Sequence, residues 1–159
     1  MKSIESISNH IGFDKIFSVC RDETTGKVDW RKVVKYNDLP DGLIDKYFFQ
    51  LQKFALEKEQ NLSPGILQKY KNSINWAMLL KTHVLDVEQL EDYIETIKSK
   101  GQFWIILKYA VYGKAFVINH REEVLKIALR ESHVIFNSRL NMNEKTDIIS
   151  WLRSQEISQ

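Results

Sequence analysis

A chain of 159 residues with 43% hydrophobic and 28% charged residues has the length and composition of one soluble globular domain that can bury a core. Its formal net charge of +2 is too small to indicate a polyanion-binding protein from the total alone. Cys20, the one cysteine, excludes an intrachain disulfide and favours a reducing compartment. Because we find neither a secretory signal nor an apolar run near the roughly 18 residues of a membrane span, we expect a cytoplasmic protein with no membrane partner.

The N-terminal residues 1–27 carry apolar side chains at intervals that suit helices. We expect one or two helices there, followed by a loop over residues 21–27, whose sequence RDETTGK is polar. This segment would pack on the first of the repeats described below as an N-terminal cap. The apolar residues that support the helices are Ile4, Ile7, Ile11, Ile16 and Phe17.

A pattern of apolar residues recurs along the middle of the chain. The stretches LPDGLIDKY, LSPGILQKY and LDVEQLEDY begin at Leu39, Leu62 and Leu85, so each step is 23 residues. In each stretch the leucine precedes a helix N-cap and the residue five places on lies in the first turn, as in a hydrophobic staple. Ser63 and Asp86 are good caps. Each stretch therefore predicts the start of a short helix that carries a tyrosine.

Another helix is predicted before each of these stretches. VDWRKVVKY has Asp29 as its expected cap with Trp30 after it, and INWAMLLKT has Asn75 and Trp76 in the same places. The middle copy, LQKFALEKE, has Lys53 where the others have tryptophan. Each repeat is therefore predicted to be a hairpin of a first helix, which starts near the tryptophan place, and a second helix, which carries the leucine and the tyrosine.

Further, more degenerate repeats are expected after residue 100. QFWIILKYAVYGKAFVINH aligns when Phe103 takes the tryptophan place and His120 takes the tyrosine place, although a short β-hairpin around Gly113 is an alternative for its second half. A fifth repeat would run from Leu125 through Val134. Degenerate copies are typical near the end of a repeat array, because terminal repeats must face water.

The closing residues 141–159 predict a C-terminal capping helix. In NEKTDIISWLRSQ, Asn143 is the expected cap, and Ile148, Ile149 and Leu152 fall on one face. The chain is thus predicted to be a single all-α domain. Short helical hairpins over residues 28–140 would stack as a solenoid-like array between the N-terminal cap and this capping helix.

The repeated pattern of Val or Ile, Asp or Asn, and Trp, followed by Lys-Tyr, Leu, a branched aliphatic residue and Tyr, resembles a short tandem repeat of large DNA virus and bacteriophage proteins, with phrases of the kind VDW…KY..LSE.FI. The resemblance covers residues 28–93 and extends weakly over residues 101–140, and Lys53 departs from it. It implies a helical repeat array of phage or viral origin. It brings no catalytic residues with it.

Five cationic residues follow the tryptophan places, or their expected equivalents, at the same distance. If repeats stack at the usual helix spacing of about 8–10 Å, these side chains would form a basic row that suits a nucleic-acid backbone or an acidic partner. The alternative is that a cation in the last turn of each first helix only complements the helix dipole. The five residues are Lys35, Lys58, Lys81, Lys108 and Arg130.

We call Trp104, Lys108 and Tyr109 the predicted contact patch. If Phe103 faces the core, Trp104 is rotated away from it by about 100° on a helix. Exposed tryptophan, tyrosine and lysine side chains can act as hot spots for a protein partner. The third repeat also carries an acidic face that is either solvated or complementary to a basic protein, formed by Glu88, Glu91, Asp92 and Glu95.

The sequence contains no pattern typical of a catalytic or metal site. Its four histidines are not spaced as metal ligands, and it has neither a phosphate-binding glycine loop nor a nucleophile motif. We therefore expect no metal, no cofactor and no enzymatic activity; an enzyme would need a pocket between repeats. The leading hypothesis is a small phage or viral accessory protein that binds a host protein or protein complex, such as a defence nuclease or the transcription machinery, and inhibits or redirects it. The alternative is a nucleic-acid-binding protein that uses the basic row.

Overall fold

The computed structural model describes residues 13–36, 38–85 and 87–157 of the chain. Within these ranges the regular secondary structure is helical and there is no strand, so the all-α prediction is confirmed. The polar loop over residues 21–27 is also confirmed, and one isolated bridge between Arg21 and Val28 closes it. The predicted positions of Ile4, Ile7 and Ile11, and the predicted cap at Asp86, lie outside the described residues.

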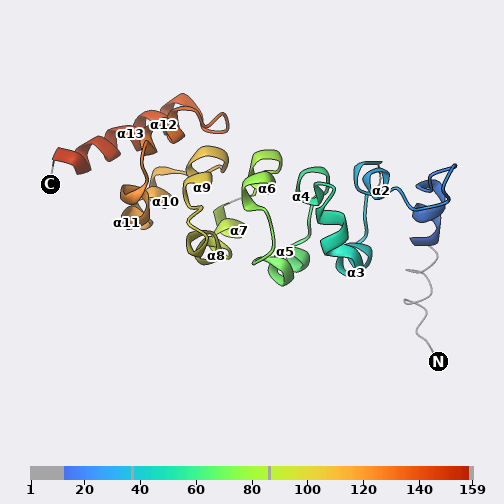
Figure 1. The fold of residues 1–159 in the computed structure, drawn as a ribbon. Helices are drawn as coiled ribbons and strands as arrows, with labels where there is room; N and C mark the ends of the chain where they lie inside the picture. Colours follow the sequence, from blue (N-terminus) through green and yellow to red (C-terminus); the bar gives the residue numbers. More distant parts are fainter. Residues whose placement is uncertain (1–12, 37, 86, 158–159) are drawn as a thin grey trace. The chain divides into compact units, whose positions relative to one another are not determined.

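Contacts between residues divide the chain into two compact units, Met1–Tyr70 and Lys71–Gln159. The first unit contains a helical stretch over residues 13–19 and four named helices (Figure 1), which are α2 (Trp30–Tyr36), α3 (Asp41–Gln52), α4 (Leu56–Glu59) and α5 (Pro64–Tyr70). The second unit contains α6 (Trp76–Thr82), α7 (Val87–Glu91), α8 (Ile94–Ser99), α9 (Trp104–Tyr109), α10 (Lys114–Asn119), α11 (Arg121–Lys126), α12 (Arg130–Ile135) and α13 (Met142–Ile157). Because α10 is a helix, the alternative of a β-hairpin around Gly113 is wrong.

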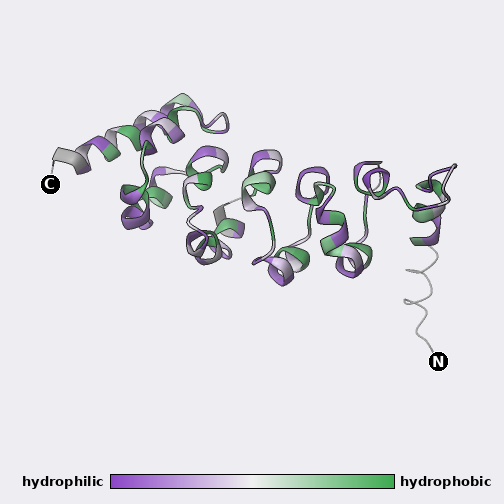
Figure 2. Cartoon of the chain, viewed as in Figure 1, coloured by the Kyte–Doolittle hydropathy of each residue, from purple (hydrophilic) through white to green (hydrophobic). Residues whose placement is uncertain are grey.

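Helical hairpins stack within each unit, as the repeat pattern predicts. In the first unit the first helices α2 and α4 pack on each other, and so do the second helices α3 and α5. In the second unit α9 packs between α6 and α12, while the closing helix α13 packs on α12 and α10. Figure 2 shows hydrophobic residues on the faces that these helices turn toward one another. Leu39, Leu62 and Leu85 are 8%, 6% and 7% exposed, so the repeated leucine is buried to a similar degree in all three copies.

The aromatic residues of each repeat pack together in pairs. The ring in the tryptophan place contacts the ring in the tyrosine place in three repeats, with centroid distances of 5.1 Å for Trp30 and Tyr47 and 4.9 Å for Trp76 and Tyr93. The third pair is Phe103 and His120, at 5.7 Å. These pairs explain why a repeat that shares few other letters keeps two aromatic positions, because aromatic pairs stabilise a core beyond their buried area.

The middle repeat replaces this pair with a contact to the repeat before it. Lys53 in the tryptophan place is exposed. The Tyr70 ring instead stacks on Phe48 of α3, with centroids 3.8 Å apart and planes 3° from parallel. The Tyr70 hydroxyl donates to the Asp45 carboxylate at 2.7 Å, and Lys69 pairs with the same carboxylate. The hydrogen bonds from Lys69 and Tyr70 lower the pKa of Asp45.

Three of the predicted helix caps are confirmed and one is wrong. Asp29 accepts from the backbone N–H of Arg31 and Lys32, Ser63 from that of Ile66, and Asn75 from that of Met78. The closing helix α13 is capped by Asn141 instead of Asn143. Asn141 Oδ1 accepts from the Glu144 N–H at 3.0 Å, and Glu144 Oε2 accepts from the Asn141 N–H at 2.8 Å. This reciprocal pair is a capping box, which satisfies two N–H groups at once.

The second helices break at the tyrosine place, which the sequence did not predict. Tyr47 inside α3, Tyr93 between α7 and α8, and His120 between α10 and α11 have φ values of −123°, −117° and −107° and ψ values of 20°, −4° and 31°. Each break is followed by another short helical stretch. These three repeats are therefore a first helix, a second helix and a kinked continuation, whereas α5 of the middle repeat ends at Tyr70 and is followed by a turn.

Two first helices start from a left-handed residue in place of a side-chain cap. Ala55 before α4 has φ 65°, and Leu129 before α12 has φ 56°. Because α11 occupies the start of the expected fifth repeat, its first helix is α12 and begins at Arg130. The expectation that Arg130 ends a first helix is therefore wrong; the basic residue in the last turn of α12 is His133.

Buried side-chain amides connect consecutive first helices. Gln60, which follows α4, donates to the Val34 carbonyl of α2 at 2.7 Å and accepts from the Leu39 N–H at 3.0 Å. Asn137, which follows α12, donates to the carbonyls of Leu107 and Ala110 at the end of α9, at 3.0 and 2.9 Å. Helix C-termini leave carbonyls without intrahelical partners. In each unit an amide from the next repeat satisfies them.

Candidate functional site

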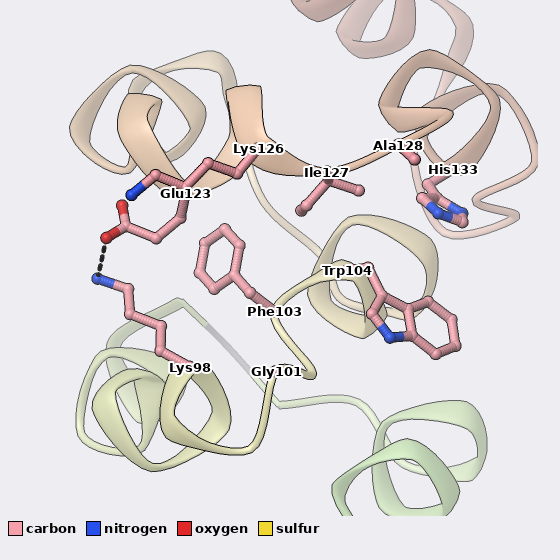
Figure 3. A pocket seen from close by; sticks show the side chains of 9 residues that line it. All are labelled: Lys98, Gly101, Phe103, Trp104, Glu123, Lys126, Ile127, Ala128 and His133. Atoms are coloured by element: carbon pink, nitrogen blue, oxygen red, sulfur yellow. Dashed lines mark ion pairs between the residues drawn. The ribbon is translucent and has the colours of Figure 1, made fainter.

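A cavity of about 450 Å³ opens in the second unit, where the turn between α8 and α9 faces α11 and α12 (Figure 3). Gly101, with φ 65°, ends α8 in a Schellman arrangement. Its N–H donates to the Lys98 carbonyl at 2.8 Å, and the Gln102 N–H donates to the Ile97 carbonyl at 3.1 Å. This tight turn brings Phe103 and Trp104 to the cavity. The cavity is lined by Lys98, Gly101, Phe103, Trp104, Glu123, Lys126, Ile127, Ala128 and His133.

Aromatic and aliphatic side chains form most of the cavity wall. Phe103 is buried and stacks against Phe116, with ring centroids 6.2 Å apart. Trp104 is half-buried, and its ring lies 5.6 Å from the imidazole of His133 at an interplanar angle of 33°. Ile127, also half-buried, projects toward both aromatic residues in Figure 3. The contacts of Phe103 with Phe116 and of Trp104 with His133 hold the two rings of this wall in place.

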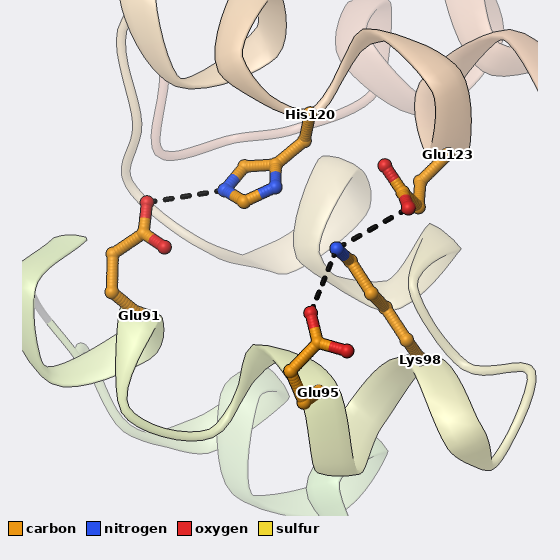
Figure 4. Close-up of polar contacts among 5 residues, drawn as sticks. All are labelled: Glu91, Glu95, Lys98, His120 and Glu123. Atoms are coloured by element: carbon orange, nitrogen blue, oxygen red, sulfur yellow. Dashed lines mark hydrogen bonds and ion pairs between the residues drawn. The ribbon is translucent and has the colours of Figure 1, made fainter.

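An ion-pair network closes one side of the cavity. Lys98 Nζ lies 3.3 Å from Glu123 Oε1 and 3.0 Å from Glu95 Oε1 (Figure 4). It also lies 5.8 Å from the centre of the Phe103 ring. Burial alone would lower the pKa of Lys98, but the two carboxylates raise it above its usual value. Burial likewise opposes ionisation of Glu123, whereas its own backbone N–H and Lys98 lower its pKa overall. Both groups are therefore held in their charged forms.

The acidic face of the third repeat is partly used inside the second unit. Glu95 pairs with Lys98, and Glu91 Oε1 lies 3.1 Å from His120 Nε2 (Figure 4). Asp92 is exposed, and the side chain of Glu88 lies outside the described residues. Two of the four acidic residues therefore contact their own unit and are not simply a solvated face.

On the opposite side of the cavity stands His133. Burial lowers the pKa of its imidazole, and the positive charge of Lys108 lowers it further. Lys108 itself lies near the Tyr109 ring, with Nζ 5.4 Å from the ring centre. The imidazole at the cavity is therefore uncharged at neutral pH, and it extends the apolar surface around Trp104.

The members of the predicted contact patch all lie on α9, and Trp104 and Lys108 are both close to His133. Trp104 lines the cavity and is rotated away from the buried Phe103, whereas Lys108 and Tyr109 are half-buried in the last turn of α9 and do not line it. Sequence reasoning missed Glu123, Ile127 and the other cavity residues from α11 onward. The only signal for them was the acidic and aliphatic face of REEVLKI, which cannot reveal a partner 25 residues away in the chain.

The residues of the predicted basic row fall into both units. Lys35, Lys58, Lys81 and Lys108 each lie in the last turn of a first helix, as expected. In the first unit, Lys35 and Lys58 line the same concave surface, which is considered below. In the second unit, Lys81 is exposed at the end of α6 and Lys108 is half-buried at the end of α9. Arg130 begins α12 and is half-buried.

Over the described part of the chain, no group of three or more His, Cys, Asp and Glu side chains is arranged to hold a metal ion. Cys20 is buried. None of the helices in the same residues combines the length and the apolar character that a membrane span requires. Two concave surfaces of the described residues remain as candidate binding sites: the aromatic cavity of the second unit and the surface of the first unit that Lys35 and Lys58 line.

Comparisons with known proteins give no relative from which a role could be transferred: no protein-family model, no curated protein and no solved structure matches this chain.

Proposed function

We propose that this protein is a non-catalytic binding protein, and that the aromatic cavity of its second unit receives an apolar side chain from a protein partner. The observation that carries the proposal is the preformed wall of Phe103, Trp104 and Ile127 beside a cavity of about 450 Å³. Pockets of this size with mostly apolar walls and few polar groups are typical of ligand and partner sites. The charged groups at the rim, Lys98 and Glu123, are engaged with each other.

A protein partner is favoured by the position of Trp104. It is half-buried, so its edge is available while its other contacts fix the ring. Tryptophan is one of the residues enriched among interface hot spots, whose loss costs at least about 2 kcal/mol of binding energy. Lys126 at the rim is exposed and would offer the partner a positive charge next to the apolar wall.

The more specific form of the proposal is a phage or viral accessory protein that binds and inhibits or redirects a host complex. It is supported by the resemblance of the Asp/Asn-Trp, Lys-Tyr and Leu pattern to viral and phage repeats. Recovery of a host enzyme complex whose activity falls when the protein is added would support this form. Recovery of a partner whose activity is unchanged would support binding but would contradict inhibition or redirection.

The test is quantitative capture from cell lysate with variants of the cavity. Trp104→Ala and Ile127→Ser should each reduce recovery of a stoichiometric partner by about tenfold or more, while thermal melts show that the fold is retained. Phe49→Ala is a matched control, because Phe49 is 61% exposed in the first unit and does not line the cavity. Equal recovery with Trp104→Ala and the wild type, or no stoichiometric partner at all, would contradict the proposal.

A further inference from the structure

A second concave surface, of about 380 Å³, lies in the first unit between the end of α2 and α4. Arg31 and Lys35 reach it from α2, where their spacing of four residues places them on one helix face. Lys53 reaches it from the turn after α3, and Lys58 from α4. All four cationic side chains are exposed. We call this surface the basic concavity.

The charge of the basic concavity is far from balanced. Its only acidic lining residue is Glu59, whose Oε1 lies 3.0 Å from Lys58 Nζ. Four cationic side chains and one carboxylate line the surface, so it presents more positive than negative groups to a ligand. A phosphate bound among these cations would be attracted by each of them.

The position of Lys53 adds a second, independent argument. In the neighbouring repeats the equivalent place holds Trp30 or Trp76, whose rings pack on the tyrosine of the same repeat. Here the tyrosine packs on Phe48 instead, and a charged side chain stands at the mouth of the concavity. The middle repeat thus lacks a packing residue that its neighbours have, and it carries a cation beside three others.

Phe54 gives the basic concavity an aromatic surface. Its ring is half-buried and lines the hollow together with Ala55. An aromatic ring among lysines and arginine is the combination that binds single-stranded nucleic acid, because bases stack on the ring while cations contact the phosphates. Paired bases of a duplex do not offer their faces to such a ring.

We propose that the basic concavity binds single-stranded nucleic acid, with phosphates on Arg31, Lys35, Lys53 and Lys58 and one base stacked on Phe54. This function does not depend on the protein-binding cavity of the second unit, since the two sites share no residue. Of the predicted basic row, this proposal keeps Lys35 and Lys58, which line the basic concavity. It adds Arg31, Lys53 and Phe54, which the row did not include.

The first test measures fluorescence anisotropy of a labelled 20-nucleotide single strand against salt concentration. The double variant Arg31→Glu/Lys53→Glu should bind about tenfold more weakly or worse. Its plot of log K against log salt should also be shallower, by about 0.7 for each phosphate contact that is lost. Lys27→Glu makes the same kind of charge change at an exposed loop residue outside the concavity and should have a smaller effect. An equal loss of affinity in the double variant and in Lys27→Glu, or no binding of the single strand by the wild type, would overturn the proposal.

The second test separates single strands from other polyanions through Phe54. Phe54→Leu should weaken single-strand binding by about 5- to 100-fold, and Phe54→Tyr, which keeps a stacking face, should restore most of it. Thermal melts identify any variant that fails to fold; Phe54→Tyr and the charge variants then still decide the question. Tighter binding of the duplex form of the same 20-mer, or identical affinities for folded Phe54→Leu and Phe54→Tyr, would overturn the proposal.

Discussion

At the scale of single residues, Leu129 holds a conformation that its side chain disfavours. Its φ of 56° lies in the left-handed region, which costs a non-glycine residue about 1–2 kcal/mol. The side chain is 75% exposed, so it gains little from packing in return. Ala55 takes the same conformation before α4. Both residues replace the Asp, Ser or Asn cap that starts other helices of the repeats.

We expect Leu129→Gly to raise the free energy of unfolding by about 0.5–1 kcal/mol, because relief of backbone strain exceeds the extra entropy of glycine in the unfolded chain. Urea unfolding followed by circular dichroism measures this change. Leu129→Ala removes the same exposed side chain but keeps Cβ, so it should bring no gain. A gain of equal size in both variants would show that the backbone conformation is not the cause.

The imidazole of His133 should make stability depend on pH. Burial and Lys108 lower its pKa below the ordinary 6.5, so the unfolded chain takes up a proton there at a higher pH than the folded protein does. The contribution of this residue is therefore present above about pH 6.5 and is lost as the pH falls toward the lowered pKa. The melting temperature of the wild type should fall more between about pH 7.5 and pH 5.5 than that of His133→Gln. Parallel decreases would exclude His133 as the cause.

At the scale of elements, the start of α13 distinguishes two asparagines that are close in sequence. Asn141 exchanges two hydrogen bonds with Glu144, whereas Asn143 is exposed and follows the cap. Asn141→Ala should lower the free energy of unfolding by about 1 kcal/mol, the usual cost of an N-cap. Asn143→Ala should change it by less than about 0.5 kcal/mol. The reverse order in chemical denaturation would mean that the helix starts later than Asn141.

Local signals in the sequence predicted the caps of α2, α5 and α6, and they failed where a distant contact decides the structure. Ser63 and Asn75 act within three residues of themselves, so their caps were readable. The break at Tyr93 was not, because a tyrosine has no intrinsic tendency to end a helix; the break accompanies packing on Trp76, 17 residues earlier. The first helix of the fifth repeat also begins later than the sequence predicted. The reason is again a break, because α11 follows the break at His120 and occupies the start of that repeat.

The candidate sites follow the same rule. Trp104 was predicted as a contact residue from its position next to Phe103, which is local information. Lys53 was recognised only as a departure from the repeat, and its place among three other cations depends on how α4 packs on α2. Lys98 pairs with Glu123, and this spacing does not match the 23-residue step of the repeat. Spacing alone predicts faces of helices and does not predict which faces meet.

At the scale of the whole molecule, the buried amides should make stability regional. Asn137 and Gln60 occupy comparable places in different units and satisfy carbonyls of α9 and α2. A buried carbonyl that loses its donor costs about 1–3 kcal/mol. Without Asn137 the Ala110 carbonyl loses this donor, whereas Leu107 still accepts from the Tyr112 hydroxyl. In stacked repeats each repeat contacts only its neighbours, so such a loss mainly destabilises the adjacent elements.

Asn137→Leu should therefore reduce hydrogen-exchange protection most in α9 and α12, and Gln60→Leu most in α2 and α4. Mass spectrometry of peptides from both units measures the two patterns, and each variant is the control for the other. An equal loss of protection in both units for either variant would mean that the chain opens as one cooperative block.

The bonds of Asn137 also govern how the polypeptide can be shortened. The main-chain oxygens of Leu107 and Ala110 accept hydrogen bonds from a side chain 30 and 27 positions later. A deletion that stops at the hairpin boundary before α12 would keep every residue of α9 and still remove both of these bonds, while the Tyr112 hydroxyl would continue to donate to the Leu107 oxygen. A C-terminal truncation of this protein therefore has to extend past Asn137 if the end of α9 is to keep these two hydrogen bonds.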